Sequence, residues 1–143
     1  MSGYANDNDD DVFDEDGWFA TGDIGYFDDD DFLYIVDRRK DMVISGGENI
    51  YCAEVEQAIE RHPAVVECAA IGQPDDRLGE RLIAIVTLLP GTESSEADIL
   101  ASCSEHLTKN KVPKSIIIGS EAMPRNATGK LIKPQIRKQY EQF

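Results

Sequence analysis

Two nearly continuous apolar segments, residues 65–71 and 82–89, constrain the fold of this chain more than any other feature. A polar connection containing QPDDRLGE separates them. Apolar runs of about four to eight residues, bounded by polar turn residues, are typical of buried strands. We therefore predict that these two segments are neighbouring strands of one sheet, joined by a polar connection.

Segments with helical periodicity lie before and after the two predicted strands in the sequence. The further predicted segments are helices at 53–61, 95–107 and 134–140 and a third strand at 115–118. His62 and Pro63 end the first helix, and Ser95 with Asp98 resembles a capping box at the start of the second. From residue 43 onward the pattern therefore predicts an α+β domain, in which helices pack on a small sheet of about three strands.

An aromatic motif and a β-hairpin precede this domain. Residues 24–27 and 32–36 are short apolar or aromatic runs around an Asp-rich loop, which predicts a hairpin as a separate piece. The motif DGWFATGD, residues 16–23, ends in Asp23. A carboxylate at this position can accept both hydroxyls of a ribose, and the alternative is an aromatic anchor followed by a turn.

Negative charge is concentrated in the N-terminal part. The net charge is −14, and residues 1–32 contain 12 acidic residues without any Lys or Arg, whereas residues 33–143 are nearly neutral. We interpret the acidic runs at 7–11 and 28–31 as solvated surface, because EF-hand spacing is absent. The chain also lacks a basic stripe, so a nucleic-acid partner is not expected.

The cysteines and histidines do not form a metal-binding pattern. Cys52, Cys68 and Cys103 fit neither a CxxC knuckle nor a disulfide framework, and His62 and His106 are isolated. We therefore expect no metal site and a reducing compartment, with Cys68 and Cys103 in the core. Neither a leader peptide nor an apolar run long enough to span a bilayer is present, which predicts a cytoplasmic protein.

Residues 37–56, DRRKDMVISGGENIYCAEVE, combine a charged junction, a glycine pair and a helix start. The cations at 38–40 lie on a connector between two strand-like segments. Gly46 and Gly47 permit positive φ or a close approach of the backbone to a bulky group. Taken alone, the segment is also consistent with a charged turn before a helix.

The polar loop PRNATGKLIK, residues 124–133, contains a Thr-Gly-Lys sequence. It is not a P-loop, because Pro124 and Leu131 stand where that motif requires glycine and a hydroxyl residue. What remains is a loop that presents Lys130. Such a lysine is usually a surface residue, but it can also neutralise charge that develops on a phosphate or carboxylate.

Three motifs in this order and spacing, GWFATGD, DRRKDMVISGGENIYCAEVE and PRNATGKLIK, resemble the C-terminal portion of adenylate-forming enzymes. The resemblance is closest to acyl-CoA synthetases of the fatty acid and aryl acid CoA ligase group, and it covers residues 17–138. It implies that a carboxylic acid and MgATP give an acyl-adenylate and pyrophosphate, after which the thiol of CoA displaces AMP.

The resemblance also implies roles for single residues. Asp23 and Arg38 would bind the ribose of the nucleotide, and Lys130 would be the catalytic lysine that contacts the acid and the α-phosphate during adenylation. Lys40 and Asp41 would lie in the hinge about which the small domain rotates between the half-reactions.

The remaining implications concern CoA and the domains. Gly46 and Gly47 would line the pantetheine tunnel. Residues 1–37 would be the end of a large N-terminal domain, 38–41 the hinge, and 42–143 the small C-terminal domain.

On this hypothesis the chain is a C-terminal fragment that is inactive alone, binds no cofactor by itself and has the large domain as its partner. Two alternatives remain at this point. One is an amino-acid-activating or carrier-protein-loading relative, and the other is a free-standing binding module without catalysis.

Overall fold

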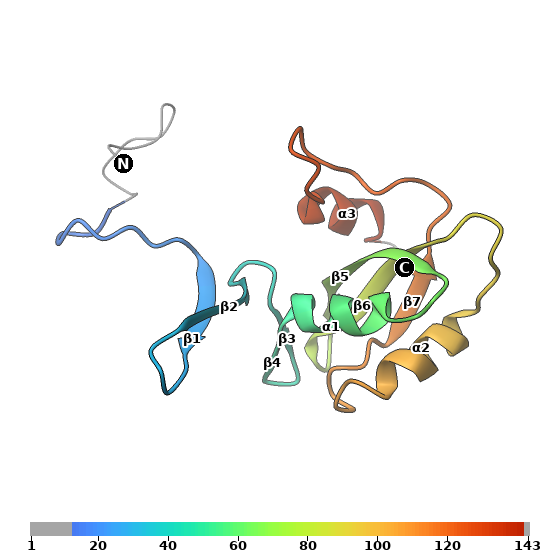
Figure 1. Cartoon of the computed structure of the whole chain (residues 1–143), viewed down its shortest axis with the longest axis horizontal. Coiled ribbons are helices and arrows are strands. Elements are labelled where there is room, and N and C mark those ends of the chain that lie inside the picture. Colours follow the sequence, from blue (N-terminus) through green and yellow to red (C-terminus); the bar gives the residue numbers. More distant parts are fainter. Residues whose placement is uncertain (1–12, 142–143) are drawn as a thin grey trace. The chain divides into compact units, whose positions relative to one another are not determined.

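Strands β5 (Val65–Asp75) and β6 (Gly79–Leu88) form the longest strand pair of a five-stranded sheet in the computed structural model, which describes residues 13–141 (Figure 1). They pair antiparallel, with Ala70 opposite Ala84. β3 (Val43–Ser45) and β7 (Ser115–Ile118) both pair with β6, the first antiparallel and the second parallel. These strands confirm the predicted pair of neighbouring apolar strands and the predicted third strand.

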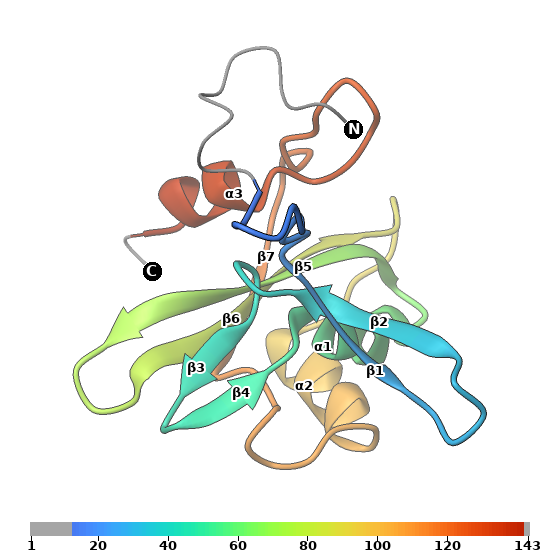
Figure 2. The ribbon, with the colours of Figure 1, turned by 90° about the vertical axis from the view of Figure 1, so that its left-hand side faces the viewer.

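Helices cover both faces of this sheet, which explains why the middle of β5 and of β6 is continuously buried. Successive residues of a strand point to opposite faces. Leu82, Ala84 and Val86 join the core under helices α1 (Cys52–Glu60) and α2 (Glu96–Ser104). Ile83 and Ile85 join a second core under α3 (Lys133–Gln139). Figure 2 shows α3 above the sheet and the other two helices below it.

The helices form where their apolar spacing and end residues favour them. Helix α1 buries Cys52, Val55 and Ile59, and thus presents one apolar stripe to the sheet. Helix α2 begins with the predicted capping box, in which Ser95 and Asp98 bond each other's backbone amides. The predicted α+β class is thereby confirmed.

The number of strands differs from the prediction of about three. β3 and β4 (Glu48–Ile50) are only three residues long each and form a hairpin closed by Gly46 and Gly47. Both glycines have positive φ, 60° and 84°, as a two-residue hairpin turn requires. The sequence pattern predicts a strand that starts at Val43, which β3 matches, but it predicts a glycine loop where β4 forms.

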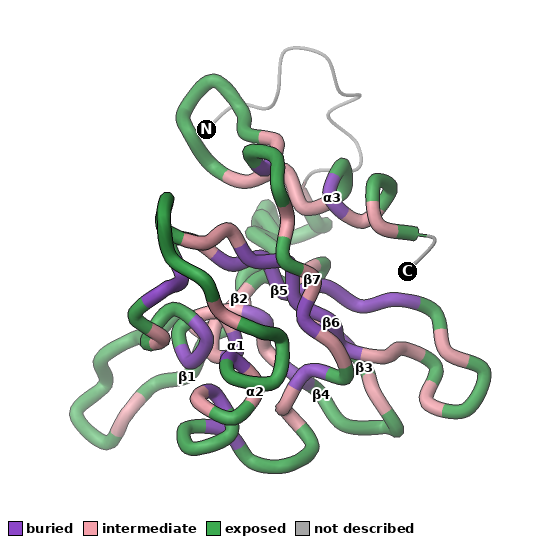
Figure 3. Tube along the Cα trace, turned by 90° about the vertical axis from the view of Figure 1, so that its right-hand side faces the viewer, coloured by how far each residue is buried: buried purple, intermediate pink, exposed green. Residues whose placement is uncertain are grey.

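The chain divides into two compact units, residues 1–40 (unit 1) and residues 41–143 (unit 2). In unit 1, β1 (Asp23–Phe27) and β2 (Leu33–Arg38) form the predicted antiparallel hairpin. The buried hydrophobic residues of the described chain all belong to unit 2, and Figure 3 shows them gathered along β5 and β6. The predicted acidic run at 7–11 lies outside the described residues.

The helices of the described chain are short. Within residues 13–141, none is long and apolar enough to cross a membrane.

Candidate functional site

An ion pair lies at the open end of the β1–β2 hairpin in unit 1. Asp23 and Arg38 are opposite each other in the strand register, and Arg38 Nε lies 3.3 Å from Asp23 Oδ1. The Thr21 hydroxyl accepts a hydrogen bond from the Asp23 amide, which fixes the start of β1. The two residues that are predicted to bind the nucleotide are thus brought together, and both side chains are partly exposed.

A hollow of about 500 Å³ lies beside this ion pair. It is lined by Thr21, Gly22 and the three consecutive cations Arg38, Arg39 and Lys40. The amide of Arg39 donates to the Gly22 carbonyl, which ties the two sides of the hollow together. A hydroxyl and three cations suit a ligand that combines hydroxyl groups with negative charge.

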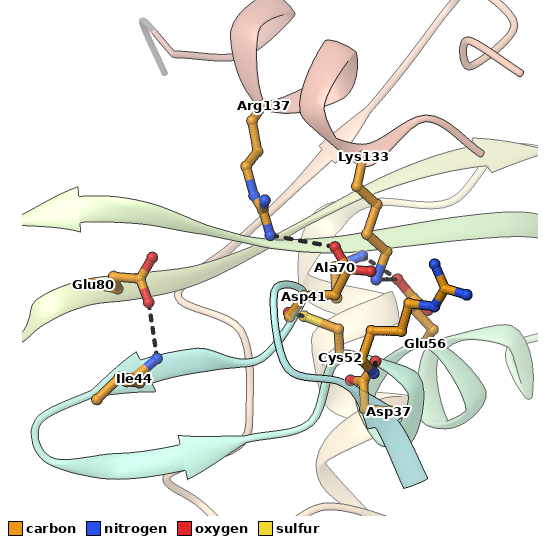
Figure 4. Close-up of polar contacts among 10 residues, drawn as sticks. Asp37, Asp41, Ile44, Cys52, Glu56, Ala70, Glu80, Lys133 and Arg137 are labelled. Carbon is orange, nitrogen blue, oxygen red and sulfur yellow. Dashed lines mark hydrogen bonds and ion pairs between the residues drawn. The ribbon is translucent and has the colours of Figure 1, made fainter. Parts of the chain in front are cut away.

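In unit 2, the turn at Gly46 and Gly47 presents backbone that carries no side chains, and this surface is called the glycine edge. The Gly46 amide donates to the Leu78 carbonyl, 2.8 Å away, so this turn lies against the β5–β6 connection. A Cβ added to Gly47 would meet no atom within 4 Å. The amide of Ile44 donates to Glu80 Oε2, which also attaches β3 to β6 (Figure 4). This edge is therefore fixed in place and open to close approach.

The loop that presents Lys130 is a hydrogen-bonded turn. Asn126 Oδ1 accepts hydrogen bonds from the amides of Thr128 and Lys130, and the Asn126 amide donates to the Lys130 carbonyl. Gly129, with φ of 83°, permits the reversal of the chain. The backbone of Lys130 is therefore held from both sides while its side chain is exposed.

The boundary between the two units falls between Lys40 and Asp41, within the predicted hinge segment 38–41. Asp41 is anchored in unit 2. Its carboxylate lies 3.7 Å from Arg137 of α3, and its carbonyl accepts a hydrogen bond from the Cys52 thiol (Figure 4). Lys40 lines the hollow of unit 1. The two predicted hinge residues thus belong to different units.

A partly buried ion pair, which the sequence interpretation missed, joins α3 to α1. Lys133 Nζ lies 2.7 Å from Glu56 Oε1, and Glu56 also accepts a hydrogen bond from the Ala70 amide of β5 (Figure 4). Burial alone lowers the pKa of Lys133, but the Glu56 carboxylate and other acidic groups outweigh it, and the pKa is raised. No sequence spacing links the two residues, because they meet only through packing on the sheet.

Figures 1 and 2 show the β3–β4 turn and the loop before α3 at opposite ends of unit 2. The glycine edge and Lys130 are therefore not parts of one site. Within residues 13–141, no group of His, Cys, Asp or Glu is placed to hold a metal ion.

The match to a family model decides the identification. Residues 54–130, more than half of the chain, match the model described as "AMP-binding enzyme C-terminal domain". The chain belongs to this family. The matched region of this AMP-binding enzyme C-terminal domain extends from α1 to Lys130 and so includes the Lys130 loop but not the β3–β4 turn.

The relatives are CoA ligases by name. The chain is 52% identical over 130 residues to the long-chain-fatty-acid–CoA ligase FadD13 of Mycobacterium tuberculosis, covering 91% of this chain and 25% of the relative. It is 44% identical to 2-succinylbenzoate–CoA ligase of Bacillus cereus, over 90% of this chain and 26% of the relative.

The solved structures agree with this assignment. ATP-bound MatB from Rhodopseudomonas palustris is 39% identical, with a TM-score of 0.83, and the match covers 92% of this chain and 26% of MatB. The C-terminal domain described here thus spans about a quarter of the length of the relatives it matches.

Proposed function

We propose that this chain is the C-terminal part of an ATP-dependent acyl-CoA synthetase that activates a fatty acid or a related carboxylic acid. The identity of 52% to a long-chain-fatty-acid–CoA ligase carries the proposal. In the first step a carboxylate oxygen attacks the α-phosphorus of ATP and pyrophosphate leaves. In the second step the sulfur of CoA attacks the acyl carbon and AMP leaves.

Lys130 is the proposed catalytic residue of the first step. Negative charge accumulates around the α-phosphate when the carboxylate attacks, and a positioned ammonium group stabilises such charge. The structure around Lys130 supports this role, because a hydrogen-bonded turn holds its backbone while its side chain is exposed and its amino group is available.

The hollow in unit 1 is the proposed contact of this chain with the nucleotide. The Asp23 carboxylate can accept both ribose hydroxyls, and the guanidinium of Arg38, 3.3 Å away, orients it and can contact the same ribose. The neighbouring cations suit the negative charge of the nucleotide.

The two half-reactions make different demands on unit 2. Adenylation requires Lys130 at the phosphate, whereas thioester formation requires a narrow channel for the pantetheine arm, which Gly46 and Gly47 can line. Since these features lie at opposite ends of unit 2, rotation about Lys40 and Asp41 would present them in turn.

The proposed substrates of the complete enzyme are MgATP, CoA and the acid, and its remaining domain is the proposed partner of this chain. The proposed compartment is the cytoplasm. Three free, buried cysteines support a reducing environment, and burial raises the pKa of the Cys68 and Cys103 thiols, which keeps them neutral.

A hybrid enzyme tests the proposal. This chain would replace the aligned C-terminal quarter of the M. tuberculosis ligase, and acid-dependent ATP–pyrophosphate exchange and acyl-CoA formation would be measured. We expect both activities in the hybrid and neither in the purified chain alone. A hybrid that folds and binds ATP but catalyses neither step would contradict the proposal, as would acyl-CoA turnover by the chain alone.

A further inference from the structure

The guanidinium of Arg125 connects the Lys130 loop to the sheet. Its Nη1 atom donates to the carbonyl oxygen of Gly129, 2.5 Å away, and its Nη2 atom pairs with Oε2 of Glu67. One planar group thus joins the peptide immediately before Lys130 to a carboxylate of β5. The rigid fork of arginine is suited to such a bridge, because it directs two donors at two fixed acceptors.

Glu67 is a well-supported anchor for this bridge. It lies near the start of β5, opposite Thr87 of the central strand β6. Its side chain is only 18% exposed, whereas that of Arg125 is 45% exposed, and the Thr87 hydroxyl lies 3.5 Å from its other oxygen. The carboxylate is therefore held on a strand that is paired along its length with β6.

The other polar contacts of the loop are mostly internal. Asn126 bonds to Thr128 and Lys130, and these bonds shape the turn without attaching it to the sheet. On the C-terminal side, attachment comes from α3, whose Lys133 pairs with Glu56. On the N-terminal side, the bridge from Arg125 to Glu67 adds a polar attachment to the sheet, beside the apolar packing of Met123.

We infer that Arg125 and Glu67 are positioning residues for Lys130: through Gly129 they fix where the ammonium group meets the reacting phosphate. The inference rests on the proposed function, because it concerns the adenylation role of Lys130. A catalytic group that is misplaced by about 1 Å can lose on the order of a hundredfold in rate. A bridge that only stabilised the fold would affect both half-reactions together.

Two conservative substitutions test this in the hybrid enzyme described above. Glu67→Gln removes the ion pair, and Arg125→Lys keeps the charge but cannot hold both acceptors. We expect kcat for ATP–pyrophosphate exchange to fall roughly 10- to 100-fold with KM for ATP nearly unchanged. Thioester formation from supplied acyl-adenylate should stay within about twofold, because that step does not use Lys130.

Glu54→Gln is the matched control. It breaks the ion pair between Glu54 of α1 and Lys111, which is also partly exposed and does not touch the Lys130 loop. We expect this variant to resemble the unsubstituted hybrid in both half-reactions. Equal losses in both half-reactions of Glu67→Gln, or full adenylation by it, would overturn the inference.

Amide exchange in this chain by itself separates the inference from the proposed function. The Gly129 and Lys130 amides should exchange several-fold faster in Glu67→Gln and Arg125→Lys than in Glu54→Gln. Unchanged exchange in all variants overturns the inference even if the hybrid is active. An unsubstituted hybrid that folds and binds ATP but is inactive overturns the proposed function, and with it the role of Lys130.

Discussion

At the scale of single residues, Lys130 is the side chain whose loss should separate the two half-reactions. In the hybrid enzyme, Lys130→Ala should lower acid-dependent ATP–pyrophosphate exchange by a hundredfold or more, on the order of the loss of one transition-state donor. Thioester formation from supplied acyl-adenylate should largely remain. Lys109→Ala, which removes another exposed lysine of unit 2, is the control. Equal loss of both steps in Lys130→Ala would contradict the assigned role.

For Gly47 we expect the opposite separation of the two half-reactions. Its φ of 84° is strained for a residue with a Cβ, by roughly 1–2 kcal/mol, although the Cβ itself would meet open space. Gly47→Val should therefore impair thioester formation more than adenylation, because the branched side chain enters the proposed channel. Gly91→Val is a matched control, since Gly91 has a φ of 79° and equally open surroundings. Similar effects of the two variants would show that strain alone is responsible.

The ion pair between Lys133 and Glu56 should make the free energy of unfolding fall at alkaline pH, where Lys133 loses its proton. The pKa of Lys133 is raised in the folded chain, so its contribution is complete below the unfolded pKa and is lost as pH rises through the folded pKa. Lys133→Met should reduce the free energy of unfolding by about 1–3 kcal/mol at neutral pH, since it leaves the Glu56 carboxylate without its cation.

Denaturant unfolding across pH checks this prediction. The difference between the wild-type chain and Lys133→Met should be constant from neutral pH to about 10 and shrink above that. If the difference in stability disappeared as the pH falls below neutral instead, a titratable group other than Lys133 would be responsible for it.

At the scale of the elements, the start of α2 is held by its capping box. Ser95→Ala removes the acceptor for the Asp98 amide and the side-chain partner of Asp98, and should cost about 1 kcal/mol. The Ser95 side-chain and backbone bonds lower the pKa of Asp98, so this contribution is present at neutral pH and is lost as pH falls through that lowered pKa. Thermal unfolding of both chains at pH 7 and pH 3 measures it. A difference that grows in acid would contradict the capping role.

At the scale of the whole molecule, the two units should differ in stability. The described buried hydrophobic residues lie in unit 2, whereas Tyr26, Phe27, Phe32 and Ile35 of the β1–β2 hairpin are each more than half exposed. A two-stranded hairpin without a covered face is marginally stable in water. We expect amides of β1 and β2 to exchange within seconds to minutes in this chain, while those of β5 and β6 stay protected for far longer. Equal protection of both units would contradict this difference.

The sequence by itself determined the elements whose signal is local. The apolar runs of β5 and β6, the stripe of α1 and the capping box of α2 follow from residue types within a few positions of one another, and the structure confirms them. The same holds for the positive φ of Gly46 and Gly47, since only glycine adopts such a backbone readily. The motif order also sufficed for the family, which the match over residues 54–130 confirms.

Only the tertiary structure decided which distant side chains meet. The pairs Glu56–Lys133, Glu67–Arg125 and Asp41–Arg137 join residues that have no common spacing, and each forms because helices and loops pack on the same sheet. The five-stranded sheet is likewise a tertiary result, because the short strands β3 and β4 join it only by pairing with β6 and with each other. Local periodicity specifies helices and strands through short-range sterics and burial. Contacts across the sheet depend instead on where the fold of the whole chain places residues that are distant in sequence.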